Sequence, residues 1–283
     1  MNIKITSDST CDLSPELIAQ YNITLLPLQI IKQGTSFTDG VNITPADIFA
    51  HVAAGGDLCT TAAVNIGTYR AMFESLSREY DAVIHINLGS GFSSCYQNAC
   101  LAAEGLENVY IVDSQNLSTG QGHIVLEACE RAQSCTDAAL LSEELRKLAG
   151  RVEASFILNR LEYMVKGGRC SAVAALGANL LKLKPCIEVV DGKMRIAKKY
   201  RGSYAKCLTA YIKERLNGRK DIVEDKLFIT HTPVDESDLK VAKAAVRQYG
   251  HFSRIMETMA GCTISCHCGP GTLGILFIRT EQD

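Results

Sequence analysis

The chain has 283 residues and a mass of 30.7 kDa; 47% of its residues are hydrophobic and 21% are charged. This composition excludes a wholly disordered chain, and the length favours two domains. The 29 Lys and Arg residues against 31 Asp and Glu give a formal net charge of −2, which excludes the strongly basic surface that binds nucleic acid or an anionic membrane.

The sequence also predicts where the protein resides. It begins with MNIKITSDST, which lacks the basic region and apolar run of a secretory signal. Its apolar stretches, such as 23–31 and 273–278, have the length of strands and fall short of the about 18 residues that a membrane span needs. The twelve cysteines are scattered and contain no C-x-x-C pair. We therefore expect a cytoplasmic protein with reduced thiols and no integral membrane segment.

The first half of the sequence alternates between strand patterns and helix patterns. Strands are expected at 3–6, 82–88 and 109–112. Two helices are expected to begin at the cap pairs Ser14–Pro15 and Thr44–Pro45. Four more are expected to span about 67–80, 93–104, 119–132 and 137–148. This alternation predicts an α/β fold whose mostly parallel N-terminal sheet is covered by helices on both faces.

The second half has a different pattern. The segments 186–190 and 194–198 flank Asp191–Gly192, which is the signal of a β-hairpin. Further strands are expected at 226–230 and 273–278, and helices at about 203–216 and 236–249. The sequence therefore predicts a C-terminal α+β domain with a mixed or antiparallel sheet. We place the N-terminal domain at 1–160 and the C-terminal domain at 161–283.

The loop Leu88–Ser94, with the sequence LGSGFSS, joins a predicted strand to a predicted helix. Ligands of such sheets bind beyond the carboxyl ends of the strands. Small residues let the backbone approach a ligand, and the hydroxyls of Ser90, Ser93 and Ser94 join the free amides of a helix start, which together indicate an anion site. The alternative is that Ser93 or Ser94 simply caps the helix. The residues alone leave both interpretations open.

Three other polar segments give weaker signals. The pair Thr60–Thr61 is the kind of sequence that usually forms a turn. The segment 166–169, with the sequence KGGR, either directs the Arg169 cation at a ligand or ends a helix beside a solvated arginine. Arg201 follows Lys198–Lys199, a run that is more typical of a solvated surface.

Two apparent motifs near the C-terminus do not fit cofactor or metal chemistry. GPGTLG at 269–274 matches G-x-G-x-x-G but runs into a strand, whereas a dinucleotide site opens a helix. Adjacent His267 and Cys268, with Cys262 and Cys266, cannot easily converge on one tetrahedral zinc ion. We therefore expect no cofactor and no metal.

An enzymatic alternative rests on chain order. Ser93, Asp113 and His267 follow one another as the triad of α/β-hydrolases does. The nucleophile elbow G-x-S-x-G is incomplete, because Cys95 stands at the position of the second glycine. A serine hydrolase is therefore the alternative to a binding protein.

Eight segments, taken in order, resemble the DegV family over nearly the whole chain. They are SDSTCDL at 7–13, TT at 60–61, SGFSSCYQNA at 90–99, VDS at 112–114, GGRCS at 167–171, KP at 184–185, DG at 191–192 and HCGPGTLG at 267–274. The resemblance implies two α/β domains that hold one long-chain fatty acid, such as palmitate, stearate or oleate, in a tunnel between them. It further implies a carrier, not an enzyme, that presents the carboxylate to a separate fatty-acid kinase for acyl-phosphate formation.

The resemblance also implies roles for individual residues. The family's LSGTY-type segment reads Phe92–Tyr96 here, FSSCY, so Ser93 inherits the role of carboxylate ligand and Ser94 lies beside it. The TSQPS-type segment reads TTAAV at 60–64, which makes Thr61 the first choice for the companion hydroxyl and Thr60 the second. Arg169 and His267 are implied as further head-group residues, and Arg201 as a kinase-docking residue.

Overall fold

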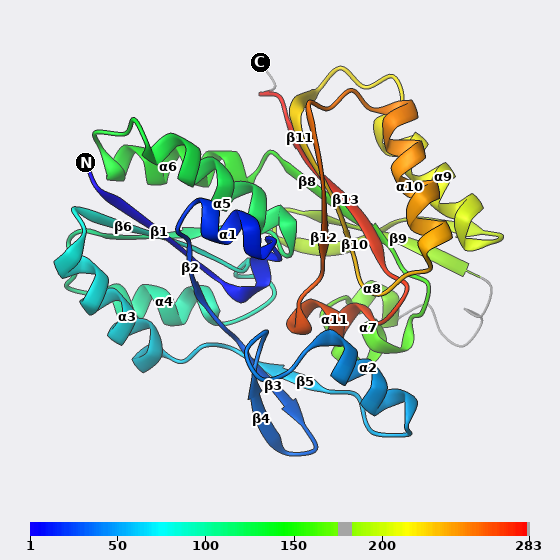
Figure 1. The fold of residues 1–283 in the computed structure, drawn as a ribbon, viewed down its shortest axis with the longest axis horizontal. Helices are drawn as coiled ribbons and strands as arrows, with labels where there is room; N and C mark the ends of the chain where they lie inside the picture. Colours follow the sequence, from blue (N-terminus) through cyan, green and yellow to red (C-terminus); the bar gives the residue numbers. More distant parts are fainter. Residues whose placement is uncertain (175–182, 282–283) are drawn as a thin grey trace.

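The computed structural model describes residues 1–174 and 183–281 (Figure 1). The N-terminal sheet has the strand order β2-β1-β6-β7, and each neighbouring pair is parallel. Its strands are β1 (Ile3–Asp8), β2 (Thr24–Leu26), β6 (Ala82–Asn87) and β7 (Val109–Asp113). The prediction of a parallel N-terminal sheet is confirmed.

Helices cover both faces of this sheet, as the alternating pattern predicts (Figure 1). One face carries α1 (Pro15–Gln20), α5 (Thr119–Ala132) and α6 (Ala138–Ala149), and the other carries α3 (Ile66–Glu79) and α4 (Cys95–Ala103). Local capping starts several of them. Ser14, Asn65 and Asp137 each accept a hydrogen bond from an amide of the first turn. A short 3₁₀ turn, η1 (Ser9–Cys11), follows β1.

The C-terminal sheet is mixed, and its strand order is β10-β9-β8-β13-β11-β12. Only the β11–β12 pair is parallel among the described pairs of this sheet. The strands are β8 (Val152–Ile157), β9 (Leu183–Val190), β10 (Lys193–Arg201), β11 (Ile222–His231), β12 (Arg254–Met259) and β13 (Leu273–Arg279). Helices α9 (Tyr204–Leu216) and α10 (Glu236–Tyr249) lie beside the sheet (Figure 1). The predicted mixed sheet and hairpin are therefore both confirmed.

The expected division of the chain at residue 160 cuts across this sheet. Strand β8 lies before residue 160, yet it pairs with β9 and β13. The C-terminal sheet therefore begins at Val152. The expected start of the C-terminal domain at residue 161 stays a prediction. Strands β8 and β12 were not predicted, because each lies close to a helix and the local pattern there does not separate strand from loop.

A small third sheet was also not predicted. It has the order β4-β3-β5, and with α2 (Pro45–Ala53) it lies beneath α7 (Glu162–Gly167) and α11 (Cys262–Cys268) in Figure 1. Its strands are β3 (Gln29–Lys32), β4 (Thr35–Thr38) and β5 (Thr60–Ala62), while the short α8 (Ser171–Ala174) follows α7. Ile30, Ile48 and Cys59 share one buried cluster with Cys262 and Cys266. An N-terminal segment is thus packed against C-terminal helices, which brings β5 close to α11.

Helix α5 joins the two large sheets. It contacts β1 and β6 on one side and β8 and β13 on the other. This explains why its side chains are buried around most of its circumference, including Ile124, Val125 and Leu126. The two halves of the molecule therefore share one core. Within the described residues, we find no helix with the length and hydrophobicity needed to cross a bilayer.

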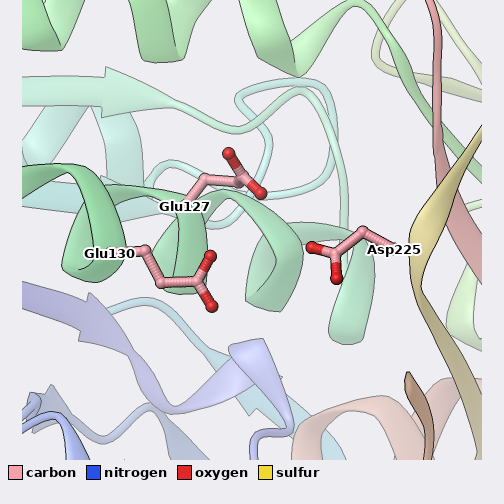
Figure 2. A group of neighbouring side chains, drawn as sticks. All are labelled: Glu127, Glu130 and Asp225. Carbon is pink, nitrogen blue, oxygen red and sulfur yellow. The ribbon is translucent and has the colours of Figure 1, made fainter. Parts of the chain in front are cut away.

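An ion cluster also joins α5 to β11. Figure 2 shows Glu127 and Glu130 on the helix and Asp225 opposite them. Three carboxylates at this spacing resemble a metal site, but the Lys226 ammonium lies 2.9 Å from Glu127, 2.5 Å from Glu130 and 3.3 Å from Asp225. Burial opposes its charge, yet hydrogen bonds to both glutamates raise the pKa of Lys226. The lysine is therefore the buried counter-ion of this cluster, and the more exposed Arg131 and Arg254 also pair with its carboxylates.

Replacing Lys226 with Met should lower the free energy of unfolding by about 2 to 3 kcal/mol, because the cluster loses its buried cation and the three carboxylates keep only their contacts with the more exposed Arg131 and Arg254. Urea unfolding followed by circular dichroism measures this change. Lys240→Met is the matched control: the Lys240 side chain is 71% exposed and pairs with Glu236 at the surface, so it should contribute about 0.5 kcal/mol or less. Equal effects of the two substitutions would contradict the role of Lys226.

Candidate functional site

A cavity of about 280 Å³ lies where loops of the N-terminal sheet meet α11. Its polar wall consists of Thr61, Ser93, Ser94, Arg169, Thr263 and His267. Its remaining wall is apolar, with Leu28, Leu88, Phe92, Leu117, Met194 and Ile264 among its residues. A smaller void of about 30 Å³ shares Leu117, Ile264 and Cys268 with it and has almost entirely apolar walls. The site is therefore polar at one end and apolar at the other.

Ser93 lies at the start of α4, in the loop that follows β6. Its Oγ accepts a hydrogen bond of 3.2 Å from the Cys95 amide and lies 3.2 Å from the Cys95 Sγ. Ser94 is the N-cap residue of α4, but its side chain makes no cap hydrogen bond. Ser93 thus satisfies an amide of the helix start and lines the cavity as well. The helix cap and the anion site are compatible interpretations of this loop.

The loop Leu88–Ser94 lies directly against the hairpin between β9 and β10. A Cβ added to Gly91 would collide with the carbonyl oxygen of Gly192. The absence of a side chain at Gly91 therefore permits this close approach. The same hairpin contributes Met194 to the cavity wall.

Thr61 and His267 meet across the cavity wall from β5 and α11. Thr61 Oγ1 lies 2.9 Å from His267 Nε2. The other ring nitrogen, Nδ1, is buried without a hydrogen-bond partner, and it faces Gly167, where an added Cβ would lie 2.6 Å away. An unprotonated Nδ1 suits this apolar contact better than an N–H group, which would lose a hydrogen bond. We therefore assign the proton to Nε2, which leaves the Thr61 hydroxyl free to donate to a ligand.

His267 is neutral at physiological pH. Burial, and to a smaller extent the positive charge of Arg169, lowers the pKa of His267 to about 4. Arg169 itself is exposed, and its guanidinium donates to the Gly167 carbonyl oxygen at 2.9 Å. The polar end of the cavity therefore combines neutral hydroxyl groups with one cation at its rim.

The two candidate threonines lie differently in the structure. Thr61 lines the cavity and also a second pocket of about 270 Å³ that shares Arg169 and His267 with it, whereas its neighbour Thr60 is exposed and lines the second pocket but not the cavity. Successive residues of a strand point to opposite faces, so only one of the pair can reach the cavity. Arg201, at the end of β10, is exposed and does not line the cavity.

Helix α11 is held by two aspartates from the N-terminal half. Asp12 Oδ1 accepts from the Gly261 amide at 2.9 Å, and Asp39 accepts from the Cys262 and Thr263 amides at 3.0 and 3.2 Å. Burial raises the pKa of Asp12 to about 7, although its hydrogen bonds from Ser118 and Gly261 oppose this shift. These contacts satisfy amides at the buried start of α11. We call them the α11 clasp, formed by Asp12 and Asp39.

The catalytic triad of the hydrolase alternative does not form. Asp113 accepts hydrogen bonds from the amide and hydroxyl of Ser90 and from the Gln115 amide, so it braces the loop. His267 is bonded to Thr61, and Ser93 is bonded to Cys95. The three residues are therefore not linked as nucleophile, base and orienting acid. Among residues 1–174 and 183–281, no three cysteine or histidine side chains lie close enough to hold a metal ion.

The chain is similar to DegV proteins over almost its full length. The model of the DegV family, described as uncharacterised proteins, matches residues 2–280. A DegV domain-containing protein of Caldanaerobacter subterraneus subsp. tengcongensis is 30% identical over 277 residues, covering 97% of this chain and 98% of that protein. One from Clostridium acetobutylicum is 30% identical over 281 residues, covering 98% of each.

Solved structures share the fold. A DegV family protein from Thermus thermophilus, described as binding fatty acid, is 25% identical and superposes with a TM-score of 0.89 over 99% of this chain and 100% of that chain. DegV of Bacillus subtilis, described as a fatty acid binding protein, is 26% identical with a TM-score of 0.81, over 99% and 100% of the two chains.

The protonation of His267 can be tested by NMR. Its pKa in the folded protein, about 4, lies below the ordinary histidine value of 6.5, so the stability that its neutral form contributes is present above pH 6.5 and is lost as the pH falls toward 4. The ring resonances of His267, assigned with the variant His267→Gln, should therefore stay constant from about pH 8 to about pH 5.5. A titration midpoint near the ordinary value would contradict the buried neutral imidazole.

Proposed function

The chain belongs to the DegV family, and we propose that it binds one long-chain fatty acid, such as palmitate, stearate or oleate, in the cavity between its two large sheets. The observation that carries this proposal is the pair of hydroxyls, Thr61 and Ser93, at the polar end of a cavity that is apolar further in. The two fatty-acid-binding relatives, at 25% and 26% identity, support it.

The apolar tail would supply most of the affinity. Each buried methylene contributes about 0.8 kcal/mol, so a sixteen-carbon chain supplies on the order of 10 kcal/mol before entropy is lost. The smaller void behind Leu117 and Ile264 extends the apolar wall inward, which supports a long and narrow ligand. Chain length would then be limited by this inner end.

The polar end would bind the carboxylate. A buried carboxylate costs several kcal/mol unless it is hydrogen-bonded. Ser93 and Thr61 can each donate a hydroxyl hydrogen, Ser94 lies beside them at the start of α4, and Arg169 places a cation at the rim. Hydroxyl donors and a nearby cation offset the cost of burial.

We propose a carrier that performs no chemistry on the ligand and requires no cofactor. The unlinked positions of Ser93, Asp113 and His267 support this over the hydrolase alternative. All twelve cysteines are free thiols, which supports the cytoplasm as its location, since that compartment keeps thiols reduced.

Replacing Ser93 with Ala should weaken oleate binding by about 1 to 3 kcal/mol, roughly 5- to 150-fold, because a buried carboxylate oxygen loses its donor. Isothermal titration calorimetry on delipidated protein measures the dissociation constant, and mass spectrometry of the extracted lipid should show a long-chain fatty acid in the protein as purified. Thr60→Val is the matched control, since Thr60 does not line the cavity, and it should bind as the wild type does. Unchanged affinity of Ser93→Ala would remove Ser93 from the head-group site, and failure of the wild type to bind would refute the function.

We further propose that the bound acid is presented to a fatty-acid kinase. In that reaction a carboxylate oxygen attacks the γ-phosphorus of ATP, the bond between the γ-phosphorus and the bridging oxygen breaks, and acyl phosphate and ADP result. Arg201 supports a docking role, because it is exposed at the end of β10 and outside the cavity. A permanent cation of this kind suits an acidic or phosphate-bearing partner surface.

Replacing Arg201 with Ala should slow acyl-phosphate formation by about tenfold or more, because the complex with the kinase would lose an arginine contact that is buried in the interface. The rate is measured as ATP consumption by a fatty-acid kinase, taken from a bacterium that encodes both such a kinase and a DegV family protein. Calorimetry checks that oleate binding is unchanged. Lys199→Ala, an exposed cation of the same strand, should have a smaller effect. A parallel loss of oleate binding would instead assign Arg201 to the ligand site.

A further inference from the structure

The second pocket, of about 270 Å³, adjoins the cavity at its polar end. Thr61, Arg169 and His267 line both spaces, so these three residues form a wall that the cavity and the pocket share. Two further polar residues, Thr60 and Lys166, line the pocket and do not line the cavity. The pocket therefore begins where the cavity ends and has polar groups of its own.

The end of α7 forms one side of the second pocket. Gly167 lies so close to α11 that an added Cβ would be 2.6 Å from His267 Nδ1, and the lack of a side chain at Gly167 permits this approach. Lys166 and Arg169 flank the contact, line the pocket and are exposed. Strand β5, beneath α7 and α11 in Figure 1, supplies two threonine hydroxyls. Segments far apart in the sequence thus bring two cations and two hydroxyl groups to one pocket.

The charges of the second pocket favour an anion that is more highly charged than a carboxylate. Its described lining residues include two cations, Lys166 and Arg169, and one carboxylate, that of the exposed Asp57. The described lining of the cavity includes only one cation, Arg169. A phosphate group carries about two negative charges at neutral pH. Lysine, arginine and hydroxyl donors together are suited to binding such a group.

We propose that the second pocket binds the phosphoryl group of an acyl phosphate whose acyl chain occupies the cavity. This inference rests on the proposed function. In an acyl phosphate the phosphorus is bonded to a carboxylate oxygen, so the phosphoryl group lies directly beside the carboxylate site at Ser93 and Thr61. The second pocket provides space there, because Thr61 lines both it and the cavity. Lys166 and Thr60 then contact the phosphoryl group and do not contact the free acid. The protein thus holds the product of the kinase reaction as well as its substrate.

Two ligands with the same acyl chain test this inference. One is oleate, and the other is the β-ketophosphonate analogue of oleoyl phosphate, in which a methylene group replaces the oxygen between the carbonyl carbon and phosphorus and prevents hydrolysis. Lys166→Gln should weaken binding of the analogue about fivefold or more and change oleate binding by less than about twofold, because only the phosphoryl group reaches Lys166. Calorimetry on delipidated protein gives both dissociation constants. Lys240→Gln is the matched control: it removes the same charge at a surface residue that does not line the pocket, and it should leave both constants unchanged.

Thr60→Val removes a hydroxyl from the second pocket alone and should also weaken binding of the analogue more than binding of oleate. Equal losses for the two ligands, or no loss for the analogue in either variant, would overturn the inference and leave fatty-acid binding intact. Inorganic phosphate, added to oleate-loaded protein, is the third probe. Phosphate binding that depends on Lys166, with analogue binding that does not, would assign the pocket to a free anion and also overturn the inference. A wild-type protein that binds no oleate would instead refute the proposed function and the inference together.

Discussion

The geometry of the site depends on the α11 clasp. Helix α11 begins in the interior, and its first amides have no partner within the helix. Asp12 and Asp39 supply acceptors from loops that lie more than half the chain away in sequence. Because the same short helix carries His267 near its other end, the clasp also sets how close His267 lies to Thr61. A contact between the two halves therefore determines the shape of the polar end of the cavity.

The polar end of the cavity is built from oriented neutral donors. His267 leaves Thr61 a hydrogen to donate, and Ser93 brings a second hydroxyl to the same cavity. A fully buried cation would bind a carboxylate more strongly, but its own desolvation would offset much of that gain. In the proposed complex the tail would supply on the order of 10 kcal/mol. The head group would then need orientation more than additional affinity, as a carrier that releases its ligand requires.

Local patterns were sufficient to predict the parallel sheet, the helices with their caps, and the hairpin at Asp191–Gly192, because each depends on neighbouring residues. The loop after a strand indicated Ser93, whereas Thr61 and His267 were implied only by the resemblance to the DegV family; the fold brings all three to one cavity. Local patterns could not predict the small sheet around β3, since its packing partners come from α11, far along the chain. Nor could they separate Thr60 from Thr61, because alternation along a strand says which residues share a face but not which face meets the cavity.

The roles of the buried aspartates could not be predicted from the local sequence either, because they depend on residues far away in the chain. In sequence, Asp8 and Asp12 read as polar residues of a loop after a strand, and their acceptor roles depend on donors at residues 69, 87, 118 and 261. A buried carboxylate is stable only when such donors converge on it. Two glycines work in the opposite sense: Gly91 and Gly167 bring backbone so close to Gly192 and His267 that a side chain would not fit. Close backbone approach and buried acceptors together hold the walls of the cavity in place around Thr61 and Ser93, where the proposed carboxylate would lie, and leave the apolar Leu117 and Ile264 for its tail.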